Sequence, residues 1–442
     1  MTTSTDKNTR SQWTFLQLEQ LKNCRSKEAI EARLGQLPKD LIGAYNEIYN
    51  NIDEGDRAIA DRAFMWVMCA EESLDSATIL EAIRIDSTKE TLELASTITE
   101  DSLLSMCSNL LVIDSASGTW KVSHLSVAEY FERSHWSMQK AHLHVVKSCL
   151  LLLLEAFASD EHVAHVAEYS QAEKGGLLGY AVRRWPEHAR TQEGEDQSAF
   201  QSMIPLVKRF LGYSTEGSTY FQKYFAHLHA YVTNKSLVTP LYIICFYGLH
   251  DTLGDWWECI EIDHWQGNPG TESPLTFAAM SNSVPLCRKL IQRGEIINTQ
   301  DNGDYGSALA AAASYGNLEV VKFLCLDAGA NVNLLLDNGD GSALAAASSY
   351  DNLEVVKFLC LDAGADVNLL LNCGPFGSAL AAAAFHDHLE IVKFLLDAGA
   401  NMDLPLKDGR YGMFEIAKYH QYLETVSAES NLGRPHDPQT LP

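Results

Sequence analysis

Residues 306–312 read Gly-Ser-Ala-Leu-Ala-Ala-Ala, and the same phrase returns at 341–347 and at 377–383. A Leu-Glu-Val/Ile-Val-Lys-Phe-Leu segment and an Asp-Ala-Gly-Ala turn follow each copy, so that whole units recur at steps of 35 or 36 residues. Self-similarity at this period is typical of stacked helix pairs, because one such pair cannot bury its own apolar face. The sequence therefore predicts an α-solenoid, whose function must be carried by its surface.

Each unit has the residues expected for two short helices joined by turns. Ser307 and its equivalents offer an oxygen to the first free amides of a helix, and the alanines that follow favour helix and allow close approach. The second helix is predicted to turn Leu318, Val321 and Leu324 inward. Gly329 and its equivalents are expected to end that helix in the left-handed conformation.

The first 235 residues follow a different sequence pattern, in which irregular helical segments surround one candidate hairpin. Apolar residues at 110–114 and 119–123 flank Ser-Ala-Ser-Gly, which predicts strand, tight turn and strand. Helices, a hairpin and a closing helix form the layout of a winged-helix unit. A nucleic-acid-binding wing would need several basic residues, but this one carries only Lys121, so the pattern favours a packing module.

These patterns divide the chain into six parts and predict a mainly α fold. They are a disordered N-terminus at 1–10, a helical segment at 11–60, a winged-helix-like region at 61–137, a helical linker region at 138–235, five solenoid repeats plus a partial cap at 239–430, and a disordered tail at 431–442.

The charge balance narrows the choice of partner. The chain has 33 Lys and Arg against 58 Asp and Glu, a formal net charge of -25. Such a surface repels phosphate backbones and anionic lipids, so it disfavours nucleic acids and membranes and suits a neutral or basic protein. The ten cysteines lack a CxxC pair, and the N-terminus lacks an apolar signal segment. Apolar runs such as the five leucines at 150–154 are too short to cross a bilayer. We expect an intracellular protein, cytoplasmic or nuclear.

The repeats resemble ankyrin repeats. Residues 389–401, Leu-Glu-Ile-Val-Lys-Phe-Leu-Leu-Asp-Ala-Gly-Ala-Asn, follow that family's second helix and turn closely, and the resemblance covers 239–430. The family's Thr-Pro-Leu-His is Ser-Ala-Leu-Ala in the three central units. Two units also carry one extra residue, at Cys325-Leu326 and Cys360-Leu361, which we expect to be absorbed as a bulge or a longer turn.

The front half resembles fungal-type NACHT/ankyrin (NLR-like) signalling proteins, in the region that follows their nucleotide-binding module. The resemblance covers 11–190, and its motifs are Leu37-Pro38 with Leu41, Tyr45 and Ile48; Trp66-Val67 with Cys69-Ala70-Glu71; Val122 with His124-Leu125-Ser126-Val127 and Glu129-Tyr130; and Tyr180-Ala181 with Trp185-Pro186 and His188.

The sequence contains no G-x-x-x-x-G-K-[ST] loop to cradle a triphosphate. His124 stands where the resembling family has a nucleotide-sensing histidine, but without that loop we expect it to be structural. His162, His165 and Glu168 share a helix face and could hold a metal, although a plain polar face is the favoured interpretation. No catalytic residues are assigned, so we expect a non-enzyme with no cofactor and no metal.

The ends of the repeats are the candidate partner-binding surface. Aromatic residues recur there at steps of 35, and the predicted hairpin tips add acids and further aromatics. The candidates are Tyr315, Tyr350, Phe385, His386, Asp301, Asp304, Tyr305, Asp337, Asp340 and Phe376, with Asn372 beside them. Aromatics flanked by acids suit a partner that brings arginine or lysine. The alternative is that each aromatic only packs on its neighbour.

Two functions remain open at this level. The first is a non-catalytic interaction scaffold that joins a NACHT-associated regulatory region to ankyrin repeats. The second is a truncated piece of an NTP-dependent signalling switch, whose nucleotide-binding module would be encoded elsewhere.

Overall fold

The computed structural model describes residue 26 and residues 40–108, 110–158, 176–192, 201–212, 217–228, 240–249, 272–371, 373 and 376–402. The chain divides into two compact units, Met1–Lys235 and Ser236–Pro442. The described parts are mainly helical with one two-stranded sheet, which confirms the predicted fold class. No helix in these ranges combines the length and the apolar character that crossing a membrane requires.

Some of the predicted features fall on other parts of the chain. The two disordered ends at 1–10 and 431–442, the partial cap beyond residue 402, Asn372, and the trio His162, His165 and Glu168 lie outside the described residues.

Within the described residues of the first unit, four helices precede the hairpin: α3 (Leu41–Asn50), α4 (Glu54–Cys69), α5 (Ser76–Ala82) and α6 (Glu100–Cys107). From the helical pattern that contains Ile79 and Ile83 we expect the third of these to begin at Ser73, but it begins at Ser76. Asp75 is the N-cap instead, because its side chain accepts a hydrogen bond from the Thr78 amide. Asp75 also forms an isolated bridge with Thr119, so tertiary pairing holds the preceding residues extended.

The predicted hairpin is present. Strand β1 (Leu111–Ile113) pairs antiparallel with β2 (Trp120–Val122), with Val112 opposite Lys121. Gly118 supplies the positive φ of 68° that the turn requires. The Trp120 indole donates to the Ser76 hydroxyl at 3.0 Å, which fastens the hairpin to the start of α5. Helix α7 (Leu125–Ser134) follows directly.

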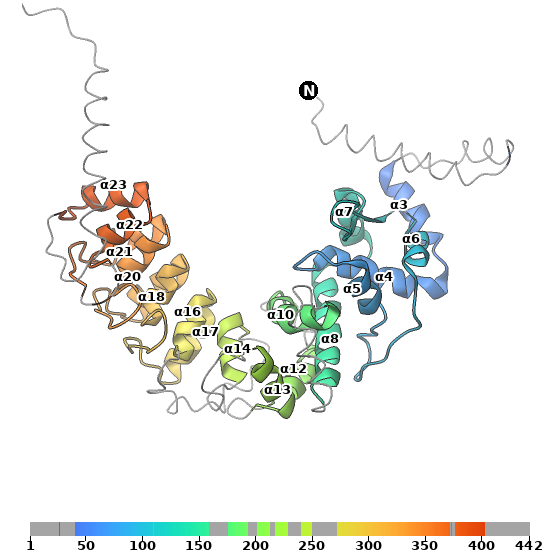
Figure 1. Cartoon of the computed structure of the whole chain (residues 1–442), viewed down its shortest axis with the longest axis horizontal. Helices are drawn as coiled ribbons and strands as arrows, with labels where there is room; N and C mark the ends of the chain where they lie inside the picture. The colour runs from blue at the N-terminus through green and yellow to red at the C-terminus, as the bar shows by residue number, and fades with distance from the viewer. Residues whose placement is uncertain are drawn as a thin grey trace, which may run out of the picture. The chain divides into compact units, whose positions relative to one another are not determined.

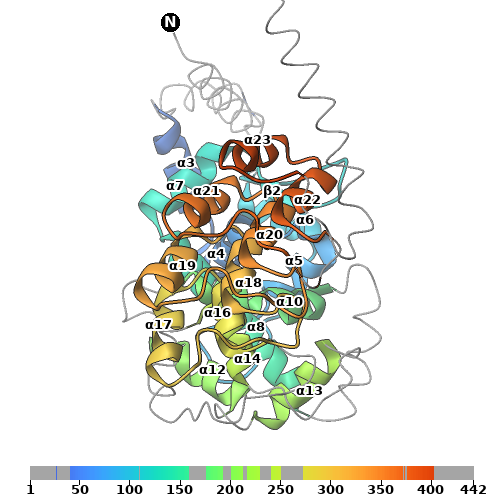
Figure 2. The same ribbon diagram turned by 90° about the vertical axis from the view of Figure 1, so that its left-hand side faces the viewer.

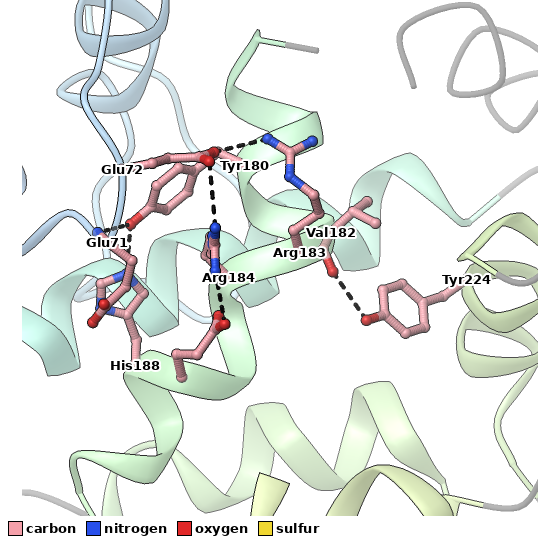
Figure 3. A network of polar contacts seen from close by, with 9 residues as sticks. Glu71, Glu72, Tyr180, Val182, Arg183, Arg184, His188 and Tyr224 are labelled. Carbon is pink, nitrogen blue, oxygen red and sulfur yellow. Dashed lines mark hydrogen bonds and ion pairs between the residues drawn. The ribbon is translucent and has the colours of Figure 1, made fainter. Parts of the chain in front are cut away.

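The remaining helices of this unit surround the long apolar helix α8 (Met138–Ala156), which packs against α4 and against α10 (Gly176–Arg190). In the part of this unit that the structure describes, two further helices follow, α12 (Ile204–Leu211) and α13 (Thr219–Leu228). The Tyr224 hydroxyl donates to the Val182 carbonyl at 3.0 Å and so ties α13 to α10 (Figure 3). Trp66 and Trp185 are fully buried in this core.

The second unit is a stack of helix pairs, which Figure 1 follows from α14 to α23. The first helices of the repeats are α14 (Pro240–Tyr247), α16 (Pro274–Met280), α18 (Ala308–Ser314), α20 (Ala343–Ser349) and α22 (Ala379–Phe385). The second helices are α17 (Val284–Gln292), α19 (Leu318–Lys322), α21 (Leu353–Leu361) and α23 (Leu389–Asp397). Figure 2 separates these two rows of helices.

The local signals of the repeats act as predicted. The Ser307, Ser342 and Ser378 hydroxyls accept from the amides three residues on, at 3.1 to 3.2 Å. Each first helix packs on the next, and their alanines are buried because no larger side chain holds the backbones apart. Gly329 and Gly364 adopt the predicted left-handed conformation, with φ of 78° and 76°.

The extra residue in two repeats is absorbed by a π-type turn. The amide of Ala400 closes the end of α23 on the Leu395 carbonyl, whereas the equivalent bond from Ala330 to Leu324 encloses one more residue. In that repeat the helix widens into the π-helix η3 (Phe323–Asp327). Two leucines in the repeats that carry the insertion remain on the surface as a result: Leu326 is 63% and Leu361 is 69% exposed.

Polar side chains between the repeats add hydrogen bonds that the bare alanine helices cannot make. The Asn352 amide group donates to the carbonyls of Ala313 and Ser314, at 2.8 and 2.7 Å. Asn317 makes the equivalent pair of bonds one repeat earlier, and His388 bonds to the Ser349 carbonyl one repeat later. These bonds fix the register of each repeat on the one before it.

Candidate functional site

Aromatic side chains lie at the C-terminal ends of three successive first helices, where His386 is the residue equivalent to Tyr315 and Tyr350, and Phe385 precedes it. Tyr315 and Tyr350 are the C-cap residues of α18 and α20, and Phe385 is the last residue of α22. Their side chains are 50%, 57% and 39% exposed, respectively. We call these three residues the aromatic line. Large aromatics exposed in successive repeats are unusual for a surface that contacts only water.

Members of the aromatic line also contact the loop of their own repeat. The Tyr305 hydroxyl donates to the Tyr315 hydroxyl at 3.1 Å, with the ring centroids 5.6 Å apart. Phe376 lies against Phe385 at 5.1 Å and against the exposed His386 at 5.3 Å. Tyr315 and Phe385 therefore pack on residues of their own loops, while both side chains are still at least 39% exposed.

Negative charge gathers next to this line. Asp304 and Asp337 are exposed, whereas Asp340 is half-buried and its pKa is raised by burial. Burial is the main cause of the raised pKa of Tyr350, and the charges of Asp340 and Asp304 add to it. These carboxylates therefore lie close enough to shape the potential around the exposed tyrosine.

Two of the predicted surface residues are instead inside the loops, so their expected exposure is wrong. Asp301 is buried, because its carboxylate accepts from the Thr276 hydroxyl and its backbone amide donates to the Gly306 carbonyl at 2.9 Å. Phe376 is buried beneath Phe385. Each of these side chains holds its loop against the repeats, and the neighbouring loop residues lie at the surface.

Nothing in the sequence indicated Glu272, which is buried against the loop that carries Tyr305. Its Oε1 accepts from the Tyr305 amide at 3.1 Å, and its Oε2 is buried without a hydrogen-bond partner among the described residues. Burial, aided by the charge of Asp301, raises the pKa of Glu272 to about 7. Burial and Asp301 raise the pKa of Glu295 to about 7 as well. Three carboxyl groups thus crowd next to the loop that carries Tyr305.

In the first unit, His124 is the N-cap of α7. Its Nδ1 accepts from the Ser126 amide at 3.2 Å and lies 2.6 Å from the Ser126 hydroxyl, which in turn contacts Tyr45 of α3 at 2.8 Å. This arrangement gives His124 a structural task at the start of a helix. Its likeness to a nucleotide-sensing histidine rests on the sequence resemblance alone.

A second polar cluster lies where α4, α8 and α10 meet. His142 and His188 face each other with their Nδ1 atoms 2.7 Å apart, and the Tyr180 hydroxyl lies 2.6 Å from the other ring nitrogen of His188. The Glu71 amide donates to that hydroxyl at 3.1 Å (Figure 3). Burial lowers the pKa of His188 to about 3 and lowers the pKa of His142. Both imidazoles are therefore neutral at physiological pH.

Comparison with known proteins identifies the repeats. The family described as Ankyrin repeats (3 copies) matches at residues 227–335, 275–371 and 344–428. The second unit therefore carries ankyrin repeats, as its sequence predicted.

Two relatives extend this comparison. The chain is 27% identical over 345 residues to "Azaphilone pigments biosynthesis cluster protein L" of Monascus ruber, which covers 71% of this chain and 65% of that protein. It is 39% identical over 67 residues to "Ankyrin repeat and SAM domain-containing protein 6" of Rattus norvegicus, which covers 15% of this chain and 8% of that protein. The chain thus spans less than two thirds of either relative. The NACHT/NLR resemblance stays a prediction.

Proposed function

We propose that this protein is a non-catalytic scaffold whose ankyrin repeats bind a protein partner through the aromatic line. The observation that carries the proposal is that the side chains of Tyr315, Tyr350 and Phe385 are exposed at the C-terminal ends of three successive first helices. Tyrosine contributes strongly to protein interfaces, because it buries a large rigid ring and keeps a hydroxyl for hydrogen bonding. Ankyrin repeats themselves indicate a role in protein–protein interaction.

The partner we expect presents arginine or lysine to this line. The chain has a formal net charge of -25, and Asp304 and Asp340 lie close enough to Tyr350 to raise its pKa. A guanidinium over a tyrosine ring gains a cation–π contact while a nearby carboxylate compensates its charge. An acidic partner would instead meet like charge at every repeat.

Selection of peptide ligands from a random library against the full chain tests this proposal. We expect the selected peptides to be enriched in arginine and lysine. The double variant Tyr315→Ala/Tyr350→Ala should bind them about tenfold more weakly or worse, which corresponds to roughly 1.4 kcal/mol or more.

The matched control is Leu326→Ala/Leu361→Ala, which removes equally exposed apolar side chains from the second helices of the same repeats. It should leave binding unchanged, and far-UV circular dichroism should show that both double variants keep the stack. Peptides that lack basic residues, or binding that is indifferent to the tyrosine substitutions, would refute the proposal.

We further infer that residues 11–190 form a NACHT-associated regulatory region. The order of helices, hairpin and closing helix α7 supports this inference, as do the motifs around Trp66 and Trp185. The competing interpretation, a piece of an NTP-dependent switch, requires nucleotide binding. Titration of the full chain with ATP and ADP should give no saturable binding in the micromolar range; such binding would favour the switch, above all if His124→Ala abolished it. Mapping the 5′ end of the transcript would then locate an encoded phosphate loop.

A further inference from the structure

One cluster of metal-binding side chains in the first unit is not used by the proposed function. Cys69 ends α4, His142 lies in the second turn of α8, and His188 lies in the last turn of α10. One ligand atom from each of the three residues lies within 4.8 Å of the others. Three helices that are distant in sequence therefore bring one sulfur and two imidazole nitrogens to a single point.

The two imidazoles already present the edges that a metal would need. Their Nδ1 atoms are 2.7 Å apart, so in the metal-free form one nitrogen must carry a proton and donate it to the other. A tetrahedral Zn²⁺ with Zn–N bonds of about 2.0–2.1 Å holds two such nitrogens roughly 3.3 Å apart. Replacing the shared proton with a metal therefore requires the two nitrogens to separate by only about half an ångström, while the sulfur of Cys69, which lies within 4.8 Å of them, closes in on the metal.

We propose that Cys69, His142 and His188 bind a divalent transition metal of the zinc class. One thiolate and two imidazoles make a borderline-soft donor set, which favours Zn²⁺ over the hard cations Mg²⁺ and Ca²⁺. The fourth position is open to water or to Glu71, an exposed carboxylate two residues beyond Cys69 whose charge acts on both Cys69 and His142.

A metal-bound histidine usually donates a hydrogen bond from the ring nitrogen that does not bind the metal, and Tyr180 is in place to accept that bond from His188. When Nδ1 of His188 binds the metal, the remaining proton moves to Nε2, which then donates to the Tyr180 oxygen 2.6 Å away. The Glu71 amide holds that oxygen in place at 3.1 Å, and Figure 3 shows Glu71, Tyr180 and His188 gathered at this point. His142 is only half-buried, which provides an entry path from solvent.

The protons of the binding step balance simply. The thiol of Cys69 loses one proton to solvent as the metal–sulfur bond forms, while the ring proton of His188 stays on that ring. No electron is transferred. The bound metal would join the ends of α4 and α10 to α8, so it acts as a cross-link within the first unit and binds the folded state in preference to the unfolded one.

Cobalt(II) is the probe for this site. The full chain, stripped with a chelator and kept reduced, should bind one equivalent of Co²⁺ with a near-ultraviolet thiolate-to-cobalt absorption band and the visible bands of a tetrahedral site. Zn²⁺ should displace it and raise the melting temperature. Cys69→Ser should remove the thiolate band, and His142→Asn should weaken binding by about tenfold or more.

Cys107→Ser is the matched control, because Cys107 is equally buried at the end of α6 and is not part of the cluster. It should retain the band and the thermal shift. If Cys69→Ser failed to fold, the half-exposed His142→Asn variant with its circular dichroism spectrum would decide the matter. Absence of a thiolate band in the wild-type chain, binding only at millimolar metal, or a band that persists without Cys69 would each overturn the proposal.

Discussion

The substitution Glu272→Gln tests how a buried carboxyl group affects the stability of the second unit, because Glu272 is buried against the loop that carries Tyr305. Its Oε1 accepts from the Tyr305 amide, and its neighbours include the buried Asp301. A glutamine keeps an oxygen for the Tyr305 amide and can turn its NH₂ group toward the Asp301 carboxylate. The substitution thus mimics the protonated acid at every pH.

The magnitude follows from the pKa. The folded protein raises the pKa of Glu272 from 4.5 to about 7. Because a tenfold change in proton affinity corresponds to about 1.4 kcal/mol, the ionised form is disfavoured by about 3.5 kcal/mol at most. Because the folded pKa is the higher one, the favourable contribution is complete below pH 4.5 and is lost as the pH rises through 7. At pH 8 the ionised Glu272 therefore destabilises the stack relative to the neutral form, by about 2 to 3 kcal/mol once screening by nearby water is allowed for.

Urea denaturation followed by far-UV circular dichroism measures this difference at pH 8 and at pH 5. We expect Glu272→Gln to raise the free energy of unfolding at pH 8 by about 2 to 3 kcal/mol, and by much less at pH 5. The control is Glu319→Gln, whose exposed carboxylate pairs with Lys322 at 2.7 Å and should change the stability by less than about 0.5 kcal/mol. A destabilised Glu272→Gln variant at pH 8, or an equal effect at the two pH values, would show that burial does not govern this group.

Three further substitutions test the packing of the two units. Asn352→Ala strips two hydrogen bonds from the carbonyls of Ala313 and Ser314 and should destabilise the stack by about 1 to 3 kcal/mol in urea denaturation; a neutral result would mean that water replaces both. Ala311→Leu forces a larger side chain between fully buried helices and should cost about 1 to 3 kcal/mol or more, so an unchanged denaturation midpoint would contradict the close approach. His124→Ala should lower the thermal stability of the first unit by about 1 kcal/mol through loss of the α7 cap, whereas His124→Asn should largely preserve it; equal losses would point to a role beyond capping.

The features predicted from the sequence are those that depend on neighbours in the chain. Ser307 caps a helix through an amide three residues away, and Gly329 needs only its own positive φ. The hairpin was predictable for the same reason, since Gly118 and its neighbours define a turn by themselves. Because the repeats recur, each of these local signals appears several times in the sequence.

The features that escaped prediction depend on contacts between distant segments. Asp301 resembles an exposed turn residue in sequence, but its loop closes over Thr276 of the preceding repeat and buries it. Glu272 precedes a capping serine, and nothing local indicates that a loop of the following repeat will cover it. The cluster of Cys69 with His142 and His188 is formed by helix packing alone, so spacing in the sequence could not reveal it.

The residues that stabilise the repeats are different from the residues that we propose bind the partner. Stability resides in thin alanine helices that pack closely and in side chains such as Asn352 that bond across repeats. Tyr315 and Tyr350 stand at the ends of those helices with about half of their surface in water, so their substitution removes little buried area. Residues at these two positions can therefore change with little effect on the stack. A scaffold built in this way can alter its partner without altering its fold, which is why loss of binding without loss of helix is the decisive outcome for the tyrosine variants.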